Sequence, residues 1–248
     1  MGKLKGYVLV KNNDIEFKIT PSFRYFWFWM QFNEGNYEKE TFIIFNKFLK
    51  KHYNYVDIGA WIGPTVLYCA PLVNKVIAFE PDPIAFRQLN KHVSINKTPN
   101  VILNNYALSS RNGSLKMSSF GGNLGDSMSS LLDTHHAKNV SIQSRTWMEF
   151  SENIDFKIDF IKIDIEGGEF ELLPTMVEYL EKYKPNIHLS LHAPYLDATV
   201  RLGEMKKIIN SIKPYYSQIL SEELKAITYD DLLTKPYTDN FTAVLLLN

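Results

Sequence analysis

The chain has little that would place it in a specialised class of protein. Of its 248 residues only Cys69 is a cysteine, which excludes an intramolecular disulfide framework and a multi-cysteine metal cluster. The 27 basic and 27 acidic residues give a formal net charge of zero, so we expect no nucleic-acid partner. No apolar run approaches the roughly 18 residues of a membrane-spanning helix. We therefore expect no membrane association either.

No secretory signal is visible near the start of the sequence. The apolar stretch at residues 7–10 is too short for a signal-peptide core, because a charge returns at Lys11. This predicts a cytoplasmic protein. What the chain does have is a globular composition, with 45% hydrophobic and 22% charged residues, and enough length to bury one sizeable core.

From residue 51 onward, strand-like and helix-like segments alternate. The seven predicted strands are 55–58, 75–80, 100–104, 158–163, 186–191, 215–220 and 241–247. Strands separated by helices predict a parallel, doubly wound sheet. No strong helix separates the last two strands, which indicates an antiparallel edge strand. We therefore predict an α/β fold with a mostly parallel seven-stranded sheet.

The first 50 residues differ from the rest. Residues 8–19 have the pattern of a β-hairpin, and 37–50 place apolar side chains at helical spacing. The aromatic run at 23–30 predicts the buried side of a lead-in helix, with a substrate lid or a homodimer surface as the alternative. We divide the chain into a hairpin and helical extension, residues 1–50, and one α/β domain, residues 51–248.

Three of the predicted strands end in residues suited to a nucleoside. In an open parallel sheet, ligands bind beyond the carboxyl ends of the strands. After the first strand, Gly59 and Gly63 permit a tight turn and a close backbone approach to a ligand at a helix N-terminus. Glu80 ends the second strand, where a carboxylate can accept both hydroxyls of a ribose. Residues 105–108 follow the third strand and suit an adenine.

Asp57 indicates which nucleoside compound binds. In a dinucleotide fingerprint a glycine stands at this position, and a carboxylate there would repel a pyrophosphate. The same carboxylate would attract the ammonium of S-adenosylmethionine, which carries a ribose and an adenine but no phosphate. We therefore predict S-adenosylmethionine as the cofactor and expect the side chain of Asp57 to face it and not the core. An NAD-dependent oxidoreductase and a catalytically silent nucleoside-binding module are the alternatives.

These motifs resemble those of the FkbM-type S-adenosylmethionine-dependent methyltransferases. The similar segments are VDIGAWIG at 56–63, AFEPDP at 78–83, NYAL at 105–108, SSL at 129–131 and IKIDIEGGE at 161–169. Two departures are Trp61, where many members have asparagine, and residues 189–192, where many have Glu-x-His. The resemblance runs from about residue 35 to about residue 195. It implies a class I Rossmann-like methyltransferase fold and O-methylation, often of sugars or other small metabolites.

The predicted cofactor site follows from these motifs. Its residues are Asp57, Gly59, Ala60, Trp61, Gly63, Glu80, Pro81, Asn105, Ala107 and Asp164. The expected methyl acceptor is a small molecule or a glycan with a reactive hydroxyl.

His192 and Asp164 are the predicted catalytic residues. Lys162 and Asp164 share one face of their strand, and His192 ends the next strand. In the fold that the resemblance implies, these strands are neighbours and bring Asp164, Glu166 and His192 together. A hydroxyl must lose its proton as it attacks the methyl group, and histidine is the usual base near neutral pH. A histidine that only pairs with a carboxylate, and a divalent metal held by the three side chains, are the alternatives; we assign no metal ligand from the sequence.

Overall fold

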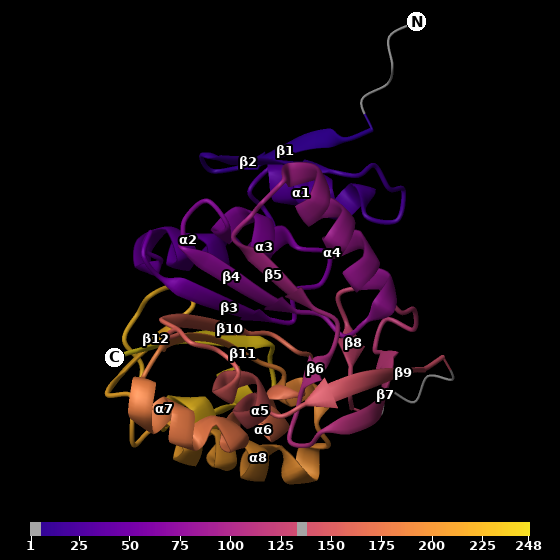
Figure 1. The fold of residues 1–248 in the computed structure, drawn as a ribbon. Coiled ribbons are helices and arrows are strands. Elements are labelled where there is room, and N and C mark those ends of the chain that lie inside the picture. The colour runs from indigo at the N-terminus through magenta and orange to yellow at the C-terminus, as the bar shows by residue number, and fades with distance from the viewer. Residues whose placement is uncertain (1–5, 133–137) are drawn as a thin grey trace, which may run out of the picture.

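A seven-stranded sheet forms the centre of the protein (Figure 1). The computed structural model describes residues 6–132 and 138–248. Across the sheet the strand order is β12-β13-β11-β10-β3-β4-β5. In chain order the strands are β3 (Asn54–Ile58), β4 (Lys75–Phe79), β5 (Val101–Asn104), β10 (Phe160–Ile163), β11 (Asn186–Leu191), β12 (Gln218–Ser221) and β13 (Thr242–Leu247). All seven predicted strands are therefore present, with ends shifted by a few residues at most.

The strand directions confirm a mostly parallel sheet with an antiparallel edge. Strands β11, β10, β3, β4 and β5 run parallel to one another, whereas β13 is antiparallel to both β11 and β12. The edge strand β12 pairs with β13 alone, and β13 lies one place in from the edge. The position of β13 follows from its composition: residues 244–246 are apolar and fully buried, which requires neighbours on both sides.

Helices cover both faces of the sheet (Figure 1). One face carries α2 (Lys39–Phe48), α3 (Pro64–Cys69) and α4 (Pro83–Asn96). The other carries α5 (Trp147–Glu152), α6 (Glu169–Leu172), α7 (Val177–Tyr183) and α8 (Ala198–Ile212). The shorter helices are η1 (Leu173–Met176), η2 (Ala193–Tyr195), η3 (Asp231–Leu233) and α9 (Lys235–Thr238). The described part of the chain contains no helix that is both long and apolar enough to cross a membrane.

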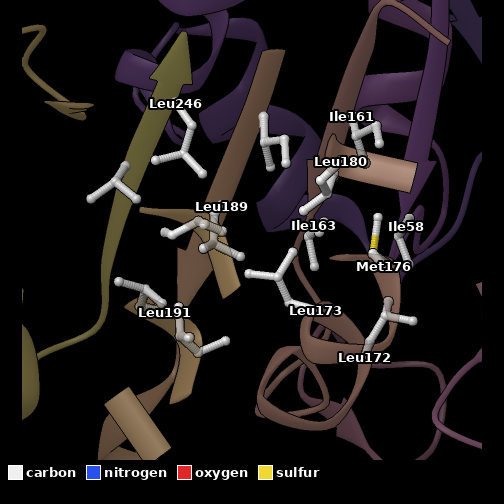
Figure 2. Packing of buried hydrophobic residues seen from close by; sticks show 14 of the residues in the cluster. Ile58, Ile161, Ile163, Leu172, Leu173, Met176, Leu180, Leu189, Leu191 and Leu246 are labelled. Carbon is white, nitrogen blue, oxygen red and sulfur yellow. The ribbon is translucent and has the colours of Figure 1, made fainter. Parts of the chain in front are cut away.

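Alternation along the strands decides which side chains enter which core. Figure 2 shows Ile163 of β10 and Leu189 of β11 in the cluster with Leu173 and Met176, on the side of α5–α8. The residues before and after these on each strand must point to the opposite face of the sheet. Lys162 therefore lies on the face of α2–α4.

The register between the strands lines up three polar residues on that face. Lys162 of β10 is paired with Asp57 of β3 on one side and with His188 of β11 on the other. All three are buried, with exposed fractions of 2% or less. A polar row thus crosses the middle of an otherwise apolar layer.

The N-terminal residues form the predicted hairpin, β1 (Val8–Asn12) and β2 (Ile15–Ile19), followed by α1 (Phe26–Asn33). The prediction for the aromatic run is only half right. Trp29 and Phe32 are buried against the hairpin, but Phe23 and Trp27 are 102% and 73% exposed. The run is aromatic all round, and only one side of an eight-residue helix meets the core.

A small second sheet stands beside the carboxyl end of β5. Its strands are β6 (Ala107–Leu108), β7 (Gly113–Ser119), β8 (Ser129–Ser130) and β9 (Val140–Arg145), in the order β6-β9-β7-β8. The loop between β7 and β8 is held to the start of α4 by Asp82. This carboxylate caps α4 by accepting from the Ile84 amide at 2.8 Å, and it accepts from the hydroxyl of Ser129 at 2.7 Å. The loop is thereby fixed next to the end of β4.

We expect the buried His92 of α4 to make stability fall in acid. It is fully buried and neutral, with Nδ1 2.8 Å from the Ile62 carbonyl and Nε2 3.1 Å from the Thr20 hydroxyl. Burial lowers its pKa from 6.5 to about 4. Between these values the unfolded chain binds more protons, so the stabilising contribution is complete above pH 6.5 and is lost as the pH falls towards 4.

The loss from this group is at most about 3 kcal/mol. Urea unfolding of the wild type at pH 7.5 and pH 5 measures it, with His92→Gln as the comparison. The difference between the unfolding free energies at the two pH values should be smaller in the variant than in the wild type. An equal difference in both proteins would show that His92 is not the titrating group.

Candidate active site

Two adjoining cavities lie beyond the carboxyl ends of β3, β4 and β10. Gly59, Trp61, Asp164 and Glu166 line both of them, so these residues form the wall between the two. The first cavity is narrow and has largely apolar walls, formed by Phe79, Pro81, Ala107, Leu108, Met117 and Leu131. The second is wider, with a volume of about 440 Å³. They occupy the edge of the sheet where the sequence predicted a ligand.

Glu80 lines the first cavity at the end of β4. Its carboxylate accepts from the backbone amide of Trp61 at 2.7 Å and from that of Asp82 at 2.8 Å. Burial raises the pKa of Glu80 to about 8, against the effect of these two amides. Each carboxylate oxygen has a second lone pair free for a ligand hydroxyl. Glu80 is therefore held in a fixed orientation at the place predicted for a ribose.

The glycine turn after β3 is required by sterics. Gly59 has a φ of 90°, and a Cβ at this position would lie 1.8 Å from the backbone oxygen of Asp164. Trp61 also has a positive φ, of 47°, and its indole NH donates to the carbonyl of Gly125 at 3.1 Å. The turn thus brings its backbone close to β10 and fixes the indole over the cavities.

The expectation that Asp57 faces the cofactor is wrong for this structure. Asp57 is fully buried, lines neither cavity, and accepts from the Thr65 hydroxyl beneath the turn. Its other carboxylate oxygen lies 3.7 Å from Nζ of Lys162. The alternation of β3 explains this, because Asp57 belongs to the polar row on the α2–α4 face. Its role at the site is to hold Lys162 and the start of α3.

The other predicted cofactor residues divide into three groups. Pro81 and Ala107 line the first cavity, and Ala60 lines the second. Asn105 turns away from both, since its amide donates to the carbonyl of Glu80 at 2.8 Å. Gly63 begins α3 with a φ of 94° and lines neither cavity. Asn105 therefore supports the end of β4, and Gly63 supports the turn after β3. Neither residue borders the space for a ligand.

His192 lies among three carboxylates, and its predicted proximity to Asp164 and Glu166 is confirmed. Its Nε2 is 3.4 Å from a carboxylate oxygen of each, and all three side chains line the second cavity. Nδ1 lies 3.2 Å from Glu169, which is fully buried and also accepts from the His192 backbone amide. Burial would lower the imidazole pKa, but Glu169, followed by Asp164 and Glu166, raises it to about 9.

Lys162 is the buried cation beneath this group. Its Nζ donates to Asp164 at 3.0 Å, which confirms that the two side chains share a face. Burial opposes the charge on Lys162, but Asp164 and Asp57 hold its pKa above the ordinary value. Burial would raise the pKa of Asp164 as well, and the lysine instead lowers it to about 2. This ion pair keeps Asp164 ionised at the wall between the cavities.

Two residues of the site have roles that the sequence did not reveal. Glu169 reaches His192 only because the turn at residues 167–168 folds α6 back under β11, and no spacing rule predicts that contact. Tyr195 follows His192 on η2, and its ring stacks parallel to the imidazole at 5.9 Å. The sequence feature that could have pointed to Tyr195 is its position three residues after the predicted catalytic histidine.

Comparison with known proteins then identifies the family. The model of the methyltransferase FkbM domain matches residues 57–225, which is more than half of the chain. This chain belongs to the FkbM methyltransferase family. Family membership confirms S-adenosylmethionine as the cofactor and a class I Rossmann-like methyltransferase as the fold. No protein among the curated sequences matches it.

Solved structures share the fold of this FkbM-family chain at low sequence identity. A methyltransferase FkbM from Methylobacillus flagellatus KT is 20% identical, with a TM-score of 0.50 over 79% of this chain. The alignment spans only 44% of that longer protein. Fibrillarin from Aeropyrum pernix, solved with S-adenosylmethionine, is 10% identical, with a TM-score of 0.45 over 80% of this chain and 67% of its own. An rRNA methylase from Streptococcus thermophilus is also 10% identical, with a TM-score of 0.45 over 83% and 93%.

Proposed function

We propose that the protein transfers the methyl group of S-adenosylmethionine to a hydroxyl of a small or carbohydrate-like acceptor. The observation that carries this proposal is the pair of adjoining cavities that share one wall. The first offers a fixed carboxylate and apolar sides, which suit a ribose and an adenine. The second, at about 440 Å³, has room for a small acceptor.

The residues of the first cavity fit the cofactor. Glu80 would hold the ribose hydroxyls, and Ala107 and Leu108 would contact the adenine. Asp164, which Lys162 keeps ionised, provides negative charge on the shared wall for a sulfonium and an ammonium. Burial raises the pKa of Glu166 to about 7, so Glu166 adds its full charge only above that pH. When bound, S-adenosylmethionine supplies a methyl group that its sulfonium has already activated. The chain therefore has mainly to align two reactants and to remove one proton.

The lining of the second cavity favours a neutral, hydroxylated acceptor. Its acids are Glu38, Asp164, Glu166 and Glu222, and its aromatic walls include Tyr37, Trp61, Tyr195 and Phe241. The basic groups in this lining, Lys162 and His192, are already close to carboxylates. A phosphate backbone would be repelled here, whereas sugar hydroxyls can donate to carboxylates and pack on aromatic rings. A cytoplasmic location, the absence of a nucleic-acid partner and a homodimer stay predictions.

We assign activation of the acceptor to His192 and Asp164. The imidazole Nε2 faces the second cavity, and the neutral ring would take the hydroxyl proton as the oxygen attacks the methyl carbon. Because the three carboxylates raise the imidazole pKa to about 9, we expect methyl transfer to increase with pH up to about 9. Glu169 holds Nδ1 and so keeps the ring in one orientation. Asp164 stabilises the imidazolium that forms.

The test of cofactor recognition is Glu80→Ala. Above its pKa of about 8 Glu80 is ionised, and charge-assisted hydrogen bonds from ribose hydroxyls contribute roughly 1.5–3 kcal/mol. Affinity for S-adenosylmethionine at pH 9 should therefore fall at least about tenfold. Isothermal titration calorimetry measures this. Glu181→Ala, which removes an exposed acid from α7 on the far face, should leave affinity unchanged. Circular dichroism checks the fold, because Glu80 also binds two backbone amides. A loss below twofold would mean that the ribose is held elsewhere.

A further inference from the structure

We propose that Asp164, Glu166 and His192 form a binding site for a divalent cation on the wall of the second cavity. One ligand atom from each of the three residues lies within 4.8 Å of those of the other two. The cation site itself depends only on these side chains. Its part in catalysis rests on the proposed methyl transfer.

The distances around Nε2 of His192 match shared coordination better than hydrogen bonding. Nε2 is 3.4 Å from the nearest oxygen of Asp164 and 3.4 Å from that of Glu166. Normal N–H···O hydrogen bonds are about 2.7–3.2 Å long. Two ligands that bind one ion at about 2.1 Å with tetrahedral angles lie about 3.4 Å apart. The imidazole is only 7% exposed, so Nε2 is directed at the two carboxylates and not at bulk water.

Two of the candidate ligands are also held from behind. Glu169 lies 3.2 Å from Nδ1 of His192 and fixes the ring, so a cation would bind at Nε2 in place of the proton on that nitrogen. Lys162 donates to the second oxygen of Asp164 at 3.0 Å. The ring of Tyr195 stacks parallel to the imidazole of His192. Such outer partners fix ligand orientation in protein metal sites.

The excess of acidic over basic side chains around the site favours a bound cation. Lys162 balances Asp164. Among the described residues, the basic side chain that pairs with Glu166 and Glu169 is His192 alone. A divalent ion that replaced the proton on Nε2 would lie between Asp164 and Glu166. One nitrogen with two oxygens is a donor set that suits Mn²⁺, Mg²⁺ or Zn²⁺.

The position of the site gives the cation a direct role in methyl transfer. Three protein ligands leave coordination positions open towards the second cavity, where the acceptor would bind. A cation-bound hydroxyl has a lowered pKa and can lose its proton to water. Its oxygen then forms a bond to the methyl carbon while the carbon–sulfur bond breaks. In this state Nε2 binds the cation and does not accept the proton, so the two uses of His192 exclude each other.

Titration of the purified chain with Mn²⁺, followed by electron paramagnetic resonance, tests the site without cofactor or acceptor. We expect one Mn²⁺ to bind per chain, with affinity reduced at least tenfold in His192→Ala and in Glu166→Gln. Glu222→Gln removes a carboxylate from the same cavity but outside the cluster and should bind Mn²⁺ like the wild type. Competition with Zn²⁺ and Mg²⁺ shows which ion is preferred.

Two outcomes would overturn the proposal: no binding of any of the three ions, or equal binding by the wild type and both cluster variants. Calorimetry with S-adenosylmethionine, performed on the same samples, keeps this result apart from the proposed function. A chain that binds the cofactor and turns over in the presence of a chelator would refute the cation's part in catalysis and leave His192 as the base. A chain that binds Mn²⁺ at the cluster but not the cofactor would refute the methyltransferase proposal alone.

Discussion

Replacing His192 with alanine is expected to reduce methyl transfer by roughly 10²–10⁴-fold, the usual range for loss of a general base. The variant removes the one imidazole in the wall of the second cavity described here, with its Nε2 3.4 Å from Asp164 and from Glu166. Affinity for S-adenosylmethionine should stay nearly unchanged, because His192 does not line the first cavity. The measurement is the rate of S-adenosylhomocysteine formation with a hydroxylated acceptor.

The control for this variant is His52→Ala. His52 is exposed in the segment before β3, and its ring contacts only Tyr53 among the aromatic pairs that the structure records. Its loss should not change turnover. If His192→Ala keeps near-normal turnover in a folded protein, the histidine is a structural partner of the carboxylates. Asp164 or water would then have to take the proton.

Replacing Lys162 with methionine should cost about 3–5 kcal/mol of unfolding free energy, the usual effect of breaking a buried ion pair from one side. Lys162 lies 3.0 Å from Asp164 and 3.7 Å from Asp57, and 3% of its side chain is exposed. Without it, two carboxylates stay in the protein interior with no lysine between them. Urea unfolding followed by circular dichroism measures the loss.

Lys157→Met is the matched control on the surface. Its ammonium lies 4.0 Å from Asp159, and 54% of its side chain is exposed. An exposed pair of this kind contributes at most about 1 kcal/mol. A similarly small effect for Lys162→Met would show that the buried carboxylates take up protons and tolerate the loss of the lysine.

The fold could be predicted because the strands and their neighbours depend on local composition. The run at 158–163 is rich in isoleucine, and Pro83 after Asp82 marks the start of α4. The place of β13 inside the sheet could not be predicted in the same way. It depends on which strands pair with residues 242–247, and one of these, β11, is far away in the sequence.

The candidate site was predicted at the level of strand ends but not of side-chain directions. Glu80, Asp164 and His192 border the cavities, because each follows a strand at the same edge of the sheet. Asp57 lies one residue from a strand end, and the alternation of β3 sends its side chain into the layer below the turn. The period of two in β3 places Tyr55 and Asp57 on the face opposite to Val56 and Ile58.

Glu169 shows why the rest of the site needed the structure. Its contact with His192 joins the first turn of α6 to the end of β11, 23 positions apart in the sequence. A carboxylate in the first turn of a helix is ordinarily explained by the helix dipole. Its second function, to orient an imidazole, depends on the backbone turn at Gly167, where φ is 96°.

The central claim is that the first cavity binds S-adenosylmethionine, and calorimetry on the wild-type chain tests it most directly. Separate titrations with S-adenosylmethionine and with NAD compare the cofactor predicted from the sequence with its alternative. The account predicts saturable binding of one S-adenosylmethionine per chain and no measurable binding of NAD. Tighter binding of NAD, or failure to bind S-adenosylmethionine at all, would contradict it.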